Sequence, residues 1–400
     1  MNPVVSESDV SPLSDITVID ITQVAAGPFA TMTLGDMGAE IIKIEAVGRG
    51  DRSRDNPPRP EYFDTLNRNK RSITLDLKTD EGQTIANSLI EDADVFIESM
   101  KPGRAEKFNL DQETVRSYND GIIYCSINGF GSESPYEDVP AYDMVIQAMS
   151  GIMSLNGEQD GPPLWSGLAS GDIAAAMYTV QSVLLALYAR ERGVITGEWI
   201  EVPMLDAAIS WIVPRAGHTF GYDEPFPRLG TQHAISAPFG VFECDTDRIV
   251  IAAGTDSLWE DLCVAIDRTD LLEREGFQTA DRRVENVDEL QEELESTLSD
   301  HSAEHWIPKL HDHQVPAGPI YDTKTVWQDK HVKQRELHVE MERPGRDNAD
   351  VIDHPVHFQE ILSTPRSPPE ELGESTEAIL SELNYSPEEI KDLREMNIVD

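Results

Sequence analysis

The stretch "TVIDITQVAAGPFATMTLGDMGAEIIKIE", residues 17–45, decides the fold. It opens with "TVIDIT", which is typical of a buried strand, and closes with a second strand, "EIIKIE". Between them, "GPFATMTLGDMG" predicts a short helix that begins at Gly27 and Pro28. A strand, a helix and a strand in this order form one crossover unit of a parallel sheet.

The same alternation continues toward residue 204. Further strands are predicted from "SITLDL", "DVFIES", "GIIYCSI" and "EWIEVPM". A helix is expected from Thr79 to about Asp92, and a long apolar helix from about Ile173 to Arg192. We therefore predict an α/β fold with a mostly parallel sheet.

The composition changes after this α/β region. Residues 213–240 are rich in loop-forming residues and are interpreted as a linker. A hairpin is expected from "VFECDTDRIVIAAG", and "QVPAGPIYD" marks a second Pro/Gly junction. We expect a large domain over 1–212, a smaller α+β domain over 225–325, and a return to the large domain over 326–400.

Charge limits the classes of partner. The 400 residues include 74 acidic and 32 basic side chains, a net charge of −42. Acidic residues are spread along the whole chain, which indicates a solvated acidic surface adapted to a salt-rich cytosol. An ordinary acidic mesophilic protein is the alternative. Nucleic acid and anionic membranes would be repelled. With neither an apolar run of ~18 residues nor a signal-like start, a cytoplasmic protein without a transmembrane helix is expected.

Metal and disulfide chemistry find little support. Cys125, Cys244 and Cys263 are widely separated and form no CxxC pair. His311 and His313 have i, i+2 spacing in a polar segment, which is not a metal pattern. We expect no metal site.

One segment of the chain has nearly equal numbers of acidic and basic residues. Between Lys43 and Lys107 there are 12 basic and 13 acidic residues, against 20 and 61 in the rest of the chain. Several of these basic residues follow predicted strands, where open α/β sheets bind ligands. They predict a site for a small phosphate-bearing ligand, with surface ion pairs as the alternative. No GxGxxG or GxxxxGK[ST] motif is present.

Asp172, in "GLASGDIAAAM", is the candidate reactive residue. An aspartate here is suited to capping the following helix. The same N–H groups and the helix dipole would keep its carboxylate ionised, as a nucleophile requires. Residue chemistry alone leaves both interpretations open.

Several ordered blocks resemble family III CoA-transferases, the formyl-CoA/carnitine-CoA transferase group. They include "NRNKRSITLDLK", "VFIESMKPGRAEKFNL", "AYDMVIQAMSG", "GPPLWSGLASGD" and "TGEWIEVPMLDA", besides the opening stretch. The resemblance spans nearly the whole chain. It implies a Rossmann-like sheet in the large domain and an interlocked homodimer.

The resemblance also implies a mechanism. Asp172 corresponds to the family's nucleophile, which carries CoA as an aspartyl-CoA thioester between an acyl-CoA and a carboxylic acid. The CoA thioester is a substrate, and no metal or other cofactor is implied. The CoA-binding residues implied are Ala25, Ala26, Leu75, Asp76, Lys78, Ser99, Met100, Lys101, Lys107, Asn128 and Phe130.

The chain departs from the family in places. Ala46 and Lys107 stand where arginine is frequent, and "RLGTQHAISAPF" replaces the glycine-rich loop of formyl-CoA members. Related racemases read Gly-His-Asp where this chain has Ala141-Tyr142-Asp143, and tyrosine is a poor proton-transfer partner at neutral pH. We expect a transferase that uses succinyl-CoA and a dicarboxylate such as mesaconate. An α-methylacyl-CoA racemase type of enzyme and a non-catalytic CoA-binding relative are the alternatives.

Overall fold

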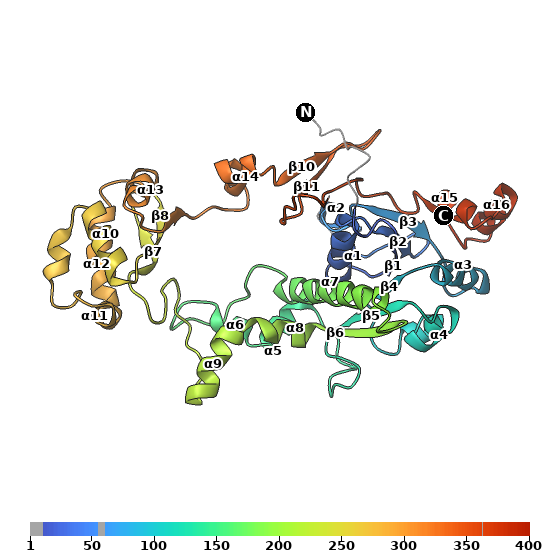
Figure 1. Ribbon diagram of the computed structural model, residues 1–400, viewed down its shortest axis with the longest axis horizontal. Coiled ribbons are helices and arrows are strands. Elements are labelled where there is room, and N and C mark those ends of the chain that lie inside the picture. Colours follow the sequence, from blue (N-terminus) through green and yellow to red (C-terminus); the bar gives the residue numbers. More distant parts are fainter. Residues whose placement is uncertain (1–10, 55–60, 362) are drawn as a thin grey trace. The chain divides into compact units, whose positions relative to one another are not determined.

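The computed structural model describes residues 11–54, 61–361 and 363–400 (Figure 1). The chain forms two compact units. The large unit comprises the chain up to Ile152, then Trp165–Gly221 and His331–Asp400, and the small unit comprises Met153–Leu164 and Tyr222–Lys330. The expected small domain, 225–325, lies within the range Tyr222–Lys330 of the small unit. Residues 153–164, which also belong to the small unit, had been expected in the large domain.

A six-stranded parallel sheet forms the centre of the large unit. Its strands are β1 (Thr17–Ile21), β2 (Glu40–Glu45), β3 (Lys70–Thr74), β4 (Val95–Glu98), β5 (Ile123–Asn128) and β6 (Glu198–Pro203). Their order is β3-β2-β1-β4-β5-β6, with every neighbouring pair parallel. This confirms the predicted Rossmann-like α/β fold. The strand order reverses between β1 and β4, and such sheets bind ligands beyond the carboxyl ends of the strands at that point.

Both faces of this sheet are covered, because successive strand residues point to opposite sides. Val18 belongs to a core shared with α1 (Ala26–Asp36), α5 (Asp143–Met149), α7 (Ser170–Glu191) and α8 (Met204–Trp211). Its neighbour Ile19 belongs to a second core, shared with α3 (Asp80–Glu91), α4 (Gln112–Tyr118), α15 (Thr376–Glu382) and α16 (Pro387–Glu395). The sheet is therefore buried on both sides, as its apolar strands require.

Helix α7 is the longest helix of the large unit. Among the described residues it is the one helix long and apolar enough to cross a membrane by length and composition. No such helix had been expected, because the chain has no uninterrupted apolar run of ~18 residues. Core helices pass the same test, and α7 packs against α1, α8, β5 and β6 through residues such as Ala175 and Val183.

The outer edge of β3 is closed by residues from far along the chain. Ser72 N donates to Glu370 Oε2 at 2.7 Å, and Thr74 N donates to Thr376 Oγ1 at 3.2 Å. Ser375 N in turn donates to the carbonyl oxygen of Ser72 at 3.0 Å. The 370–376 segment thus pairs with a strand edge that would otherwise present free N–H and C=O groups.

The small unit is built on an antiparallel sheet of β7 (Phe239–Glu243), β8 (Arg248–Ala252) and β9 (Ala317–Pro319). The pairing of β7 with β8 confirms the predicted hairpin. Helices α10 (Asp256–Ala265), α12 (Val287–Leu298) and α13 (Ala303–Asp312) share its core.

The other α-helices and strands of the described residues come from both units. They are α2 (Glu61–Asp64), α6 (Ile152–Leu155), α9 (Val213–Tyr222), α11 (Ala280–Glu285), α14 (Lys330–Gln334), β10 (His338–Met341) and β11 (Ala349–Ile352).

Candidate active site

Asp172 lies in the first turn of α7. The helix begins at Ser170, its N-cap is Ala169, and no side chain caps it. The interpretation of Asp172 as the helix cap, with the helix beginning at about Ile173, is therefore wrong. Ser170 and Gly171 lie within the helix instead. Gly171 packs closely against α5, since a Cβ there would lie 2.9 Å from Ile146 Cγ2.

The ionisation of Asp172 also differs from expectation. Burial, with a smaller contribution from the neighbouring Asp143 carboxylate, raises its pKa to about 7 even though the nearby backbone N–H of Ala26 lowers it. The helix dipole and N–H groups had been expected to keep this group ionised. Desolvation and a like charge outweigh them. Near neutral pH the carboxylate therefore exists in both protonation states.

Asp143 is the neighbour that the sequence analysis undervalued. Its Oδ1 accepts the N–H of Gly171 at 2.8 Å, and its Oδ2 accepts Gln147 Nε2 at 2.5 Å and Trp165 Nε1 at 3.2 Å. Asp143 had been considered only as part of the racemase comparison. Its place at the start of α5 was the available signal, since α5 packs against α7.

Tyr62, in α2, is a second residue that the sequence analysis missed. Burial raises the pKa of its phenol, and Asp172, Asp51 and Asp143 raise it further. The phenol is therefore within electrostatic reach of all three carboxylates. Nothing in its local sequence, "EYFD", distinguishes this tyrosine.

The turn from β1 to α1 supplies Ala25 and Ala26. Both residues are buried, and Ala26 is the first residue of α1. The following Gly27 allows α1 to approach β1 closely, since a Cβ there would lie 2.3 Å from Thr22 Cβ. At this helix start, which was predicted to face an anion, the N–H of Ala26 interacts with the Asp172 carboxylate.

Ser99, Met100 and Lys101 follow β4. Ser99 Oγ accepts the N–H of Gln23 at 3.1 Å and so joins the ends of β1 and β4. Met100 N donates to Glu98 Oε2 at 2.5 Å, and burial raises the pKa of Glu98 to about 7. Lys101 Nζ lies 3.1 Å from Asp138 Oδ1, so its charge is shared with that acid.

Leu75, Asp76 and Lys78 follow β3. Leu75 is buried in the core, and Asp76 accepts the N–H of Lys78 at 3.1 Å through Oδ1. The Lys78 side chain is exposed, as is that of Lys107 in the 3₁₀ turn Ala105–Phe108. Two of the implied phosphate-binding cations therefore face solvent.

Asn128 and Phe130 lie at the carboxyl end of β5. The Asn128 side chain donates to Glu201 Oε1 at 2.9 Å and accepts the N–H of Gly131 at 2.5 Å. Glu201 also accepts the N–H of Ser132 at 2.8 Å. The side-chain amide of Asn128 therefore stabilises the turn that follows β5, and this turn contains the buried Phe130.

The parallel strands bring these groups to one edge of the sheet. The ends of β1, β3, β4 and β5 carry the residues implied as CoA-binding, apart from Lys107. Several basic residues of the near-neutral segment are paired with acidic side chains, however. Lys43, Arg54, Arg68, Lys70 and Arg71 form ion pairs with acids of the same unit. The ion-pair alternative accounts for these five, four of which are buried or nearly so.

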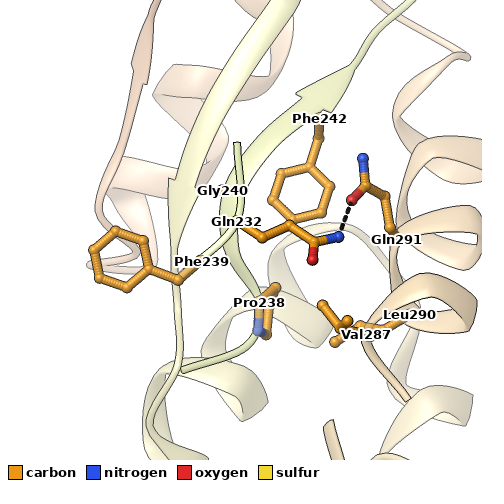
Figure 2. Close-up of a pocket in the computed structure, with 8 residues that line it drawn as sticks. All are labelled: Gln232, Pro238, Phe239, Gly240, Phe242, Val287, Leu290 and Gln291. Atoms are coloured by element: carbon orange, nitrogen blue, oxygen red, sulfur yellow. Dashed lines mark hydrogen bonds between the residues drawn. The ribbon is translucent and has the colours of Figure 1, made fainter. Parts of the chain in front are cut away.

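The small unit has a narrow pocket of its own (Figure 2). It lies where β7 faces α12, and Gln232 Nε2 donates to Gln291 Oε1 beside it at 3.0 Å. His233, in the segment "RLGTQHAISAPF", stacks on Phe239 with ring centroids 4.7 Å apart. The lining residues are Gln232, Pro238, Phe239, Gly240, Phe242, Val287, Leu290 and Gln291. They include no ionisable group.

Comparison with known proteins identifies the family. Residues 13–376 match the model of CoA-transferase family III. Succinyl-CoA:mesaconate CoA-transferase of Haloarcula hispanica is 35% identical over 92% of this chain and 96% of that protein. Succinyl-CoA:glutarate CoA-transferase of Homo sapiens is 31% identical over 98% of this chain and 91% of that protein.

A solved structure agrees. The crystal structure of a CaiB/BaiF family protein from Brucella suis matches with a TM-score of 0.87 and 32% identity, over 93% of this chain and 99% of that one. The similarity thus extends over both sequence and fold. The chain belongs to CoA-transferase family III, whose members use CoA thioesters as substrates, and it is a CoA-transferase.

Proposed function

We propose that the protein transfers CoA from succinyl-CoA to a dicarboxylic acid such as mesaconate, with Asp172 as the nucleophile. The observation that carries this is the Asp172 carboxylate in the first turn of α7, beside the N–H of Ala26 at the sheet's carboxyl edge. The relatives named for succinyl-CoA:mesaconate and succinyl-CoA:glutarate transfer support the choice of donor.

The reaction begins with ionised Asp172. Its carboxylate attacks the thioester carbonyl of succinyl-CoA, the C–S bond breaks, and a succinyl-aspartyl anhydride and CoA thiolate form. The thiolate then attacks the aspartyl carbonyl of the anhydride, releasing succinate and leaving an aspartyl-CoA thioester. The backbone N–H of Ala26 is placed to stabilise charge at the Asp172 carboxyl during these steps.

The second half repeats these steps with the acceptor. Its carboxylate attacks the aspartyl-CoA carbonyl, and CoA thiolate leaves. The thiolate attacks the acceptor's carbonyl in the new anhydride, giving the product thioester and free Asp172. One thioester replaces another, so little net free energy is involved.

The test is a panel of free acids offered with succinyl-CoA in molar salt, with CoA esters separated by liquid chromatography. Asp172→Ala should fold and lose transfer, and hydroxylamine should trap an aspartyl hydroxamate at Asp172 only after acyl-CoA is added. Retained transfer in Asp172→Ala would exclude the nucleophile. Exchange of the α-proton in deuterated water without transfer would favour the racemase alternative.

We propose in addition that the enzyme is a cytoplasmic homodimer, interlocked as the family resemblance implies. Large apolar side chains are exposed along α7, α8 and α9, where a second copy of the chain would cover them. They include Met177, Leu185, Tyr188, Ile209, Trp211, Val213 and Phe220.

A further inference from the structure

Val24 has an unusual backbone in the turn between β1 and α1. Its φ of 70° is in the left-handed region, which β-branched residues strongly disfavour. Two residues later comes Ala26, whose N–H faces Asp172. Strained backbone of this kind persists only when surrounding groups hold it.

Side chains hold the turn at three successive residues. Thr22 N donates to Asp20 Oδ1 at 2.8 Å, and Gln23 N donates to Ser99 Oγ at 3.1 Å. Val24 N donates to Asp51 Oδ1, also at 3.1 Å. Of the three acceptors, Asp51 is the one bonded to the strained residue itself.

Lys43 fixes Asp51 in turn. Its Nζ lies 3.1 Å from Asp51 Oδ2 and donates to the carbonyl oxygen of Thr22 at 2.8 Å. Lys43 and Asp51 are each 1% exposed. Burial alone would raise the pKa of Asp51, but Lys43 and the Ser53 donors outweigh it and hold the pKa below the usual value. One buried ion pair therefore holds the backbone at Thr22 and at the N–H of Val24.

We propose that Asp51 is a positioning residue, which holds Val24 in its left-handed conformation and so sets the N–H of Ala26 against Asp172. This rests on the proposed role of Asp172 as the nucleophile. Glycine adopts a positive φ readily. If Asp51 acts through Val24, the need for Asp51 should disappear when residue 24 supplies that conformation by itself.

The experiment is a double-mutant cycle of Asp51→Ala and Val24→Gly in the full-length enzyme. Asp51→Ala alone should lower kcat/KM about 100-fold, the scale of a displaced catalytic group. In the Val24→Gly background, the same substitution should cost less than about threefold. Equal losses in the two backgrounds would overturn the proposal, since a general contribution of Asp51 to folding would not depend on residue 24.

Two further variants address folding. Asp51→Ala leaves Lys43 with one buried partner fewer, so the cycle is repeated with Lys43→Met/Asp51→Ala, which removes both charges. Ser53→Ala is the matched control, because it removes a 2.7 Å hydrogen bond to the same Asp51 oxygen without touching Val24. A loss in Ser53→Ala as large as that in Asp51→Ala would also overturn the proposal. Asp172→Ala, assayed in parallel, distinguishes failure of the nucleophile from failure of the turn.

Discussion

Gly171, the residue before Asp172, donates its N–H to Asp143 Oδ1 at 2.8 Å. One carboxylate is thereby anchored to the backbone that carries the other. Because Asp143 raises the pKa of Asp172 through its charge, the pair sets the pH at which the proposed nucleophile becomes active.

Asp143→Asn should shift the pH profile of transfer to lower pH. Removing the charge lowers the pKa of Asp172 from about 7, although burial still holds it above the usual value. The measurement is the pH dependence of kcat/KM, together with hydroxylamine trapping. Asp206→Asn, which removes an exposed carboxylate from α8, is the control. An unshifted profile in Asp143→Asn would show that the two acids are not coupled.

Asp172→Asn should stabilise the fold at high pH. The folded-state pKa of Asp172 is raised above its unfolded value of 3.8, so the stability linked to this group is present below that value and is lost as pH rises through about 7. The difference in Tm between variant and wild type should therefore grow between about pH 4 and about pH 7 and then level off. A difference independent of pH would contradict the raised pKa.

Lys78→Ala and Lys107→Ala should each raise the KM for succinyl-CoA with little change in kcat. Both side chains are exposed, and one solvated phosphate contact is worth about 1 kcal/mol, or roughly fivefold in affinity. Lys309→Ala, in the small unit, is the control. Succinyl-dephospho-CoA, which lacks the 3′-phosphate, shows whether either lysine contacts that phosphate. The KM of a variant that has lost this contact should equal the KM of the wild type for the dephospho substrate.

Folding should depend strongly on salt. With 74 acidic and 32 basic residues, the negative charges repel one another and destabilise the folded state until counterions screen them. Tm should rise steeply between about 0.2 M and about 3 M KCl, where the Debye length falls well below the spacing of surface charges. A Tm that is flat over this range would favour the ordinary acidic mesophile.

Phe220→Asp should disrupt the proposed dimer. The Phe220 side chain is 86% exposed on α9, and a charge there would have to be desolvated beneath a second copy. Light scattering after gel filtration should show a shift toward monomer. Glu224→Gln, which changes charge in the following loop, serves as the comparison. An unchanged mass for Phe220→Asp would place the interface elsewhere.

The sheet was predictable because each strand is a short apolar run, and helices and turns separate one run from the next. Asp143 was harder to assign, since its importance depends on how α5 meets α7, which no local pattern encodes. Lys43 illustrates the same limit. A lysine inside "EIIKIE" suggests an exposed position, yet it is buried because Asp20 and Asp51 reach it from other segments. Local pattern predicted the elements, whereas long-range packing determined the chemistry of the site.

The closure of β3 by residues 370–376 has a consequence for biosynthesis. The first four strands of the sheet, β1 to β4, are synthesised more than 270 residues before Glu370. Until then the N–H groups of Ser72 and Thr74 lack their native acceptors. The nascent large unit therefore carries an open strand edge through most of translation, and its final stability is reached only after the last segment has been synthesised.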